Sequence, residues 1–178
     1  MPDSWTINLT GDTTRALVNQ GAVLGNVLDA GAGPFSGRFR PIFEYFDLPY
    51  FALDQQEQSG VDVVAEFPCS KEVLPVAIFP IRLLLMLSVL EHHKDPFAAM
   101  RWAYDMLEPS GYLYVAVPSC WPVHDWPSDY WRFLPDGVRL LLANFELVSL
   151  VQEHENDHSG INQIFAVARK PVCLEDLT

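Results

Sequence analysis

An aspartate stands at the end of the first segment of the sequence that is predicted to be a buried strand, and two glycines follow. In the stretch VLDAGAGPFSG, Asp29 lies two residues before Gly31, and Gly33 follows. Glycines at such a turn let the backbone approach a ligand closely. The dinucleotide fingerprint G-x-G-x-x-G requires a third glycine where Ser36 stands, and Gly37 comes one residue late. Since the Asp29 carboxylate would repel a pyrophosphate and attract a cation, the pattern favours a cationic ligand. A nicotinamide-linked oxidoreductase is disfavoured and ranks third among the alternatives.

Three further strand candidates also end in a polar residue. The segments YFALD, VDVVAE and LLLMLS end at Asp54, Glu66 and Ser88. Parallel strands end at one edge of a sheet and ligands bind there, so we expect these side chains to lie near Asp29. Only residues 55–60 separate the second and third strands, whereas a parallel crossover takes about a dozen residues or more. The third strand is therefore predicted to be short or irregular.

Strand candidates alternate with helical patterns, which is typical of an α/β fold with a doubly wound, mostly parallel sheet and helices on both faces. A helix is predicted to begin after Asp95, with Pro96 in its first turn and a stop signal at 108–111. Its apolar face would carry Phe97, Met100, Tyr104 and Leu107. The other predicted elements are strands at 26–30, 112–118, 146–151 and 162–169 and helices at 38–46 and about 135–143. Too few residues follow Val151 for a crossover helix, so the last strand is predicted to be antiparallel and inside the sheet.

The composition fits a single domain over residues 1–178, with residues 1–25 as an N-terminal extension. With 49% hydrophobic residues the chain is expected to be globular, and its net charge of -12 argues against nucleic acid as a partner. The longest apolar run, residues 76–90, is shorter than the roughly 20 residues of a membrane span and contains Pro80 and Arg82. We expect no membrane association.

Cysteine usage and the N-terminus point to the cytoplasm. The three cysteines are too widely spaced for a metal knuckle and too few for a disulfide framework: Cys69, Cys120 and Cys173. We expect them to be buried free thiols in a reducing compartment. The first residues lack the basic start and apolar centre of a signal peptide.

Five stretches together resemble the class I S-adenosylmethionine-dependent methyltransferases. They are VLDAGAG, YFALD, VDVVAEFP, LSVLEHHKDPFAAMRWAYDMLEPSGYLYVAVP and NQIFAVARKP, in the family's order from about residue 26 to residue 171. The resemblance implies a Rossmann-like sheet of seven strands in the order 3-2-1-4-5-7-6, with the seventh antiparallel. It also implies S-adenosylmethionine as the cofactor, a molecule with an ammonium and a sulfonium and no phosphate.

The resemblance assigns the methionine and ribose ends of that cofactor to the first two strand ends. Asp29, Gly31 and Gly33 would hold the methionine end. Asp54 would accept hydrogen bonds from the ribose hydroxyls, because a carboxylate can take both protons of a vicinal diol.

The adenine and sulfonium ends fall to the third and fourth strand ends. Glu66, where the family often has Asp, would meet the adenine amino group, and Phe67 would pack on the ring. The backbone at Leu87 and Ser88 would line the side nearest the sulfonium.

The loop at 119–134 is the candidate substrate loop. It is rich in tryptophan and proline, and its HDWPSDYWRF stretch is similar to a pattern found after the fifth strand in family members associated with sugar and natural-product methylation. His124 is the candidate general base, Tyr130 and Trp131 would shape the acceptor pocket, and Arg132 would give it polarity. The alternative is a hydrophobic flap that only covers the core.

Two histidines follow the fourth strand. Glu91 and His92 form a candidate catalytic dyad, and an equally weighted alternative is that they organise the loop. A metal site at His92 and His93 is disfavoured, because adjacent side chains do not point the same way. No metal is expected.

These residues predict a small cytoplasmic S-adenosylmethionine-dependent methyltransferase that acts on a hydroxyl or amine of a small polar molecule. Pro34 stiffens the glycine turn, and Phe79-Pro80 replaces the family's frequent Phe-Asp. The short N-terminal segment leaves no capping domain, so a homodimer or a partner subunit would complete the lid. The alternative function is a non-catalytic binding or scaffolding subunit.

Overall fold

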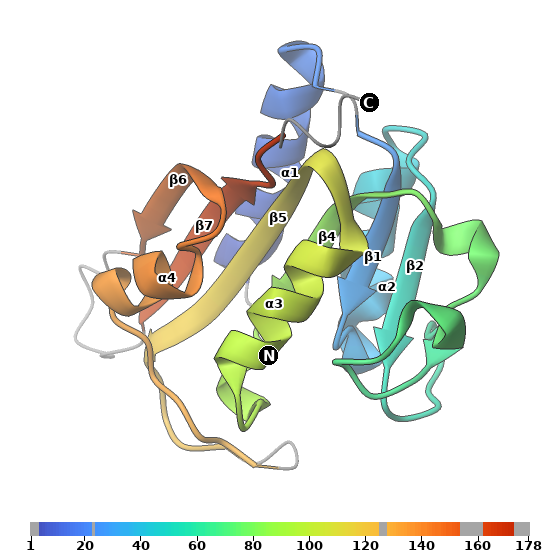
Figure 1. Cartoon of the computed structure of the whole chain (residues 1–178). Helices are drawn as coiled ribbons and strands as arrows, with labels where there is room; N and C mark the ends of the chain where they lie inside the picture. Colours follow the sequence, from blue (N-terminus) through green and yellow to red (C-terminus); the bar gives the residue numbers. More distant parts are fainter. Residues whose placement is uncertain (1–3, 23, 125–127, 154–161, 173–178) are drawn as a thin grey trace.

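A computed structural model describes residues 4–22, 24–124, 128–153 and 162–172. Within these residues the chain forms one seven-stranded sheet in the order β3-β2-β1-β4-β5-β7-β6 (Figure 1). The strands are β1 (Asn26–Ala30), β2 (Tyr50–Asp54), β3 (Val63–Val64), β4 (Ile81–Leu87), β5 (Leu107–Cys120), β6 (Glu146–Gln152) and β7 (Asn162–Arg169). The predicted strand order is confirmed.

The sheet is parallel except at its last strand. The β1, β2, β3, β4 and β5 neighbours pair in parallel. Strand β7 lies between β5 and β6 and runs antiparallel to both. The prediction of an antiparallel strand inside the sheet is therefore confirmed.

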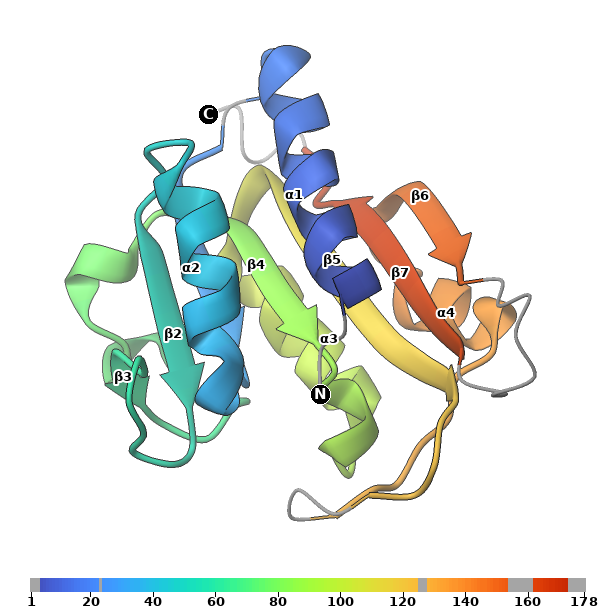
Figure 2. The same ribbon diagram turned by 180° about the vertical axis from the view of Figure 1, so that it is seen from behind.

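Helices cover both faces of the sheet. Figure 1 shows α3 (Pro96–Met106) and α4 (Pro135–Leu141) over one face. Figure 2, the view from behind, shows α1 (Ser4–Asn19) and α2 (Ser36–Glu44) over the other. The loop that follows β5 projects beyond the edge at which β1, β2 and β4 end, so it borders that edge in both views.

Successive strand residues belong to two separate cores. Leu28 packs with Trp102 on the α3 side, whereas Val27 packs with Phe43 on the α2 side. Both faces of the parallel strands are thus buried, which explains why their sequences are continuously apolar.

Helix α1 is the element that the sequence analysis missed. Its buried side is a stripe with helical spacing: Thr6, Thr10, Thr14 and Leu17. The Thr10 and Thr14 hydroxyls donate to the backbone carbonyls four residues earlier, at 2.8 Å in each case. Because threonine is polar and a weak helix former, hydrophobic periodicity gives little signal here.

Helix α3 begins as predicted but buries a different face. The Asp95 carboxylate accepts a hydrogen bond from Ala98 N at 2.9 Å, and Pro96 is the first helical residue. Phe97, expected in the core, is 44% exposed. The buried residues are Pro96, Ala99, Met100, Trp102, Ala103 and Met106. The helix is apolar on more than one side, so packing against the sheet decides which side is covered.

Strand β5 begins earlier than predicted. The residues expected to end α3, 108–111, form an irregular start to the strand: Ile81 pairs with Leu107, and Leu83 pairs with Tyr112. Strand β3 is only two residues long, as its short connection predicted. The bounds of the other predicted elements agree with the structure to within two residues.

Two further observations concern the surface. Cys69 is half-buried and Cys120 is exposed, so the expectation of buried thiols is wrong for Cys120, and Cys173 lies outside the described residues. None of the helices in the described part of the chain combines the length and the apolar composition of a bilayer span.

Candidate functional site

A cavity of about 820 Å³ lies at the carboxyl ends of the parallel strands. Cavities of about 300–1,000 Å³ are typical of small-molecule sites. All eight residues predicted to hold the cofactor line it: Asp29, Gly31, Gly33, Asp54, Glu66, Phe67, Leu87 and Ser88. The same cavity reaches His92, His124 and Tyr130.

The glycine turn is fastened to the end of β2. Gly33 N donates to Asp54 Oδ2 at 2.9 Å, and Gln56 N donates to Asp54 Oδ1 at 2.9 Å. Each carboxylate oxygen keeps a lone pair for a ligand, because an ionised oxygen offers about two acceptor sites. Gly31 has a φ of +77°, and a Cβ there would lie 2.2 Å from Val89 Cγ2. The glycines therefore approach Asp54 and Val89.

Asp29 is a buried carboxyl, 2% exposed, at the floor of this cavity. The Tyr50 hydroxyl donates a hydrogen bond to Asp29 Oδ2. Burial, with a smaller contribution from the nearby Asp54 carboxylate, raises the pKa of Asp29 to about 7. A cation in the cavity would offset both effects and hold the carboxyl in its ionised form.

Aromatic rings form the wall beside β3. Phe67 stacks on Trp102 with ring centroids 5.3 Å apart, and on His93 at 5.5 Å. The Trp102 indole N–H donates to Cys69 O at 2.8 Å, which fixes this stack. Glu66 lies at the exposed rim of the cavity.

The chain bends sharply where β4 ends. Ser88 has a φ of +55°, which is uncommon for a residue with a side chain. A 3₁₀ helix, η4 (Leu90–His92), follows directly. This bend brings the residues after β4 to the cavity. Strained backbone conformations of this kind are frequent in functional sites.

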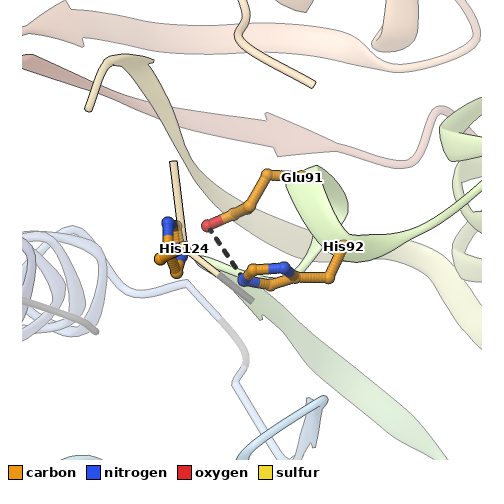
Figure 3. A group of neighbouring side chains, drawn as sticks. All are labelled: Glu91, His92 and His124. Atoms are coloured by element: carbon orange, nitrogen blue, oxygen red, sulfur yellow. Dashed lines mark ion pairs between the residues drawn. The ribbon is translucent and has the colours of Figure 1, made fainter. Parts of the chain in front are cut away.

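Glu91, His92 and His124 form a cluster at the side of the cavity that His92 and His124 line (Figure 3). His92 Nε2 lies 3.9 Å from Glu91 Oε1, and one donor atom from each of the three residues falls within 4.8 Å of the others. Glu91 is 1% exposed, and this burial raises its pKa to about 7. Burial also lowers the pKa of His92.

Hydrogen bonds join the loop after β5 to η4. Tyr130 N donates to Glu91 O at 2.8 Å, and the Trp131 indole N–H donates to His93 O at 2.9 Å. Phe133 N donates to Pro118 O at 2.9 Å, which closes the loop on β5. The loop and η4 therefore form one wall of the cavity.

Arg132 acts within the loop. Its guanidinium binds both carboxylate oxygens of Asp129, at 2.5 and 2.6 Å. These two hydrogen bonds hold the pKa of Asp129 well below its usual range. Asp129 in turn accepts a hydrogen bond from His124 N at 2.9 Å.

The structure separates the predicted substrate residues into two groups. Tyr130 lines the cavity, whereas Trp131 and Arg132 are not among its lining residues. His93 is not part of the cluster of Glu91, His92 and His124, because its two ring nitrogens lie 3.0 Å from Phe67 O and Asp95 O. Residues 125–127 of the loop lie outside the described residues.

Two residues of the site were given no role in the sequence analysis. Tyr50 holds Asp29, and only the strand register shows that it can reach that carboxyl. Asp129 holds His124 and Arg132. Opposite charges at 129 and 132 were the available signal for this second group.

No family model and no curated protein sequence matches this chain. Solved structures match its fold. A 1,6-didemethyltoxoflavin-N1-methyltransferase from Burkholderia thailandensis, with bound 1,6-didemethyltoxoflavin and S-adenosylhomocysteine, is 21% identical with a TM-score of 0.66, and the match covers 96% of this chain and 82% of that one. The N-methyltransferase NodS from Bradyrhizobium japonicum, in complex with S-adenosylhomocysteine, is 16% identical with a TM-score of 0.62 and coverages of 96% and 89%.

A third match has a different activity in its name. The [4+2]-cyclase SpnF is 15% identical with a TM-score of 0.61, and the match covers 92% of this chain and 81% of that one. The chain thus has the fold of the class I S-adenosylmethionine-dependent methyltransferases, as its strand order also shows.

Proposed function

We propose that this protein is an S-adenosylmethionine-dependent methyltransferase that acts on a hydroxyl or amine of a small polar molecule. The observation that carries this proposal is the cavity of about 820 Å³, which joins the glycine turn, two buried carboxyls and the histidine cluster. One end offers anionic partners for a cationic ligand, at Asp29 and Asp54. The other end offers imidazole nitrogens that can bind a proton or a cation, at His92 and His124.

The chemistry is the displacement of a thioether. The acceptor oxygen or nitrogen attacks the cofactor methyl, the sulfur–carbon bond breaks, and the acceptor loses its proton. An enzyme accelerates this step mainly by alignment of the two reactants and removal of that proton. The cluster of Glu91, His92 and His124 borders the place where the acceptor would lie, and proton acceptance and cation binding are both within its chemistry.

Two of the matched structures support this choice of reaction. Both are named as N-methyltransferases and hold S-adenosylhomocysteine. The match to a cyclase agrees with the rule that one fold hosts several activities, so the proposal rests on the site rather than on the fold. The proposed acceptor class rests on the sequence pattern of the loop and on the mixed apolar and polar lining of the cavity. Completion of the lid by a second copy or a partner subunit stays a prediction.

Calorimetric titration of the purified chain tests the cofactor. We expect S-adenosylmethionine and S-adenosylhomocysteine to bind and NAD not to bind. Asp54→Asn should weaken both affinities at least about tenfold, because a hydrogen bond to a charged group contributes about 1.5–3 kcal/mol. Asp105→Asn, at an exposed position of α3 outside the cavity, is the control and should leave both unchanged. Unchanged affinity in Asp54→Asn would contradict the site assignment.

Turnover separates an enzyme from a binding subunit. A panel of small hydroxyl and amine compounds is incubated with the cofactor, and formation of S-adenosylhomocysteine is measured. Turnover that requires one acceptor class supports the proposal. Binding without turnover on any compound would favour the non-catalytic alternative.

A further inference from the structure

Three electron-pair donors meet at the end of the cavity that the cofactor residues leave free. Glu91 and His92 project from η4, and His124 reaches them from the segment after β5 (Figure 3). The His92 and His124 rings are perpendicular, with centroids 4.8 Å apart. The three side chains therefore converge on one small volume.

Two atoms of this cluster are buried and have no hydrogen-bond partner among the residues that the structure describes. They are Glu91 Oε2 and His124 Nε2. Such atoms are rare in folded proteins because an unpaired buried polar group costs free energy. A cavity of about 10 Å³, enough for a single water or ion, lies directly beside both residues.

The other ring nitrogens fix the tautomer of each histidine. His92 Nδ1 lies 2.7 Å from Ser128 O, a group that only accepts, so Nδ1 carries the hydrogen and Nε2 presents a lone pair. His124 Nδ1 lies 3.2 Å from Pro122 O and 3.2 Å from Asp129 Oδ2, so the same holds for His124. The cluster thus presents two imidazole lone pairs and a carboxylate to one point.

A second layer of contacts orients His124. The Asp129 side chain is 2% exposed and is held by the two hydrogen bonds from Arg132. Carboxylate groups behind histidines orient metal ligands in this way in many proteins. Arg132 does not line the cavity, so its contact with the site is through Asp129.

We propose that Glu91, His92 and His124 bind a divalent transition-metal ion such as zinc. Two imidazoles and one carboxylate suit zinc and its neighbours, whereas magnesium and calcium prefer oxygen ligands. Three protein ligands leave a coordination position open, and His92 and His124 face the large cavity. An acceptor oxygen in that position would lose its proton more readily, a consequence that rests on the proposed function.

Titration of the chelator-treated full chain with Co²⁺ tests the site, with visible absorption as the readout and Zn²⁺ as the competitor. We expect one equivalent of Co²⁺ to bind and Zn²⁺ to displace it. His92→Ala and His124→Ala should each weaken binding at least about 100-fold, and Asp129→Asn about 10–100-fold. Thermal melts followed by circular dichroism establish that each variant is folded.

Matched controls address the other metal-binding side chains. His93→Ala should keep wild-type affinity, because its ring nitrogens contact Phe67 O and Asp95 O. Cys69→Ser and Cys120→Ser should also keep it. If His124→Ala does not fold, His92→Ala and Asp129→Asn decide the question.

Three results would overturn the proposal. They are no saturable binding of either ion, wild-type affinity in the His92 and Asp129 variants, and loss of binding in a cysteine or His93 variant. Absence of metal binding would indicate that the cluster binds a proton or a water molecule instead. These titrations contain no S-adenosylmethionine, so their failure is distinct from failure of the methyltransferase proposal, which the calorimetry tests separately.

Discussion

Val89 occupies the space that a side chain on Gly31 would need. A Cβ on Gly31 would lie 2.2 Å from Val89 Cγ2, and its φ of +77° is in the left-handed region. That region costs a residue with a Cβ about 1–2 kcal/mol, and overpacking adds about 1–3 kcal/mol. We expect Gly31→Ala to lower the free energy of unfolding by about 2 kcal/mol or more, measured by chemical denaturation.

Val89→Ala separates the two causes of that loss. Val89→Ala removes Cγ2 but keeps the Cβ, which would lie 3.0 Å from the new side chain, so in this background Gly31→Ala should cost less than in the wild type and approach the backbone contribution of about 1–2 kcal/mol. Gly37→Ala is the control, because a Cβ there meets no atom within 4 Å and alanine favours the helix by up to about 1 kcal/mol. Equal losses for Gly31→Ala and Gly37→Ala would contradict this explanation.

We expect Asp29 to make cofactor affinity depend on pH. In the free protein its pKa is raised to about 7, mainly by burial, whereas a bound ammonium would keep the carboxyl ionised. Binding then requires loss of a proton below about pH 7, so affinity should rise by up to about tenfold per pH unit from about pH 5 and level off above about pH 7.5. Calorimetric titration with S-adenosylmethionine over this pH range measures the affinity. Asp29→Asn should bind more weakly at high pH and show a flatter profile, and an unchanged slope in this variant would assign the titration to another group.

At the scale of elements, the site has two walls with separate origins. The turn after β1 and the end of β2 are joined through Asp54. The loop and η4 are joined through Glu91 O and His93 O. We expect changes at His124 or Tyr130, in the second wall, to leave the first intact.

The expected result is a split between binding and turnover. His124→Ala and Tyr130→Ala should keep S-adenosylmethionine affinity within about twofold, while methyl transfer by His124→Ala falls about 100-fold or more. Calorimetry and a turnover assay of the same preparations measure the two quantities. Loss of affinity together with a lowered melting temperature would make the loop a structural flap. Normal turnover would place the acceptor elsewhere.

At the scale of the whole molecule, the cavity is bordered by the ends of four strands, so a ligand there binds only the folded sheet. At about 100 times its dissociation constant, S-adenosylhomocysteine should raise the free energy of unfolding by about 2.7 kcal/mol. Denaturation with and without ligand measures this change. The same concentration should stabilise Asp54→Asn much less, and equal stabilisation of both proteins would indicate binding outside the cavity.

The sequence by itself determined the sheet and the residues that line the cavity at the strand ends. Strand order, the antiparallel β7 and the short β3 are confirmed. The residues predicted to hold the cofactor all line the cavity, although their roles stay predictions. The reason is local: each of them lies at the end of its own strand or within three residues after it, and parallel strands end at one edge.

Tertiary structure decided the rest. Helix α1 buries threonines, whose polarity hides the helical period, and α3 buries the face that the sheet selects rather than the one that carries Phe97. The cluster of Glu91, His92 and His124 joins two segments between which α3 and β5 lie, and no local pattern specifies that contact. It exists because β4 and β5 are parallel neighbours, so the chain after each strand reaches the same edge of the sheet.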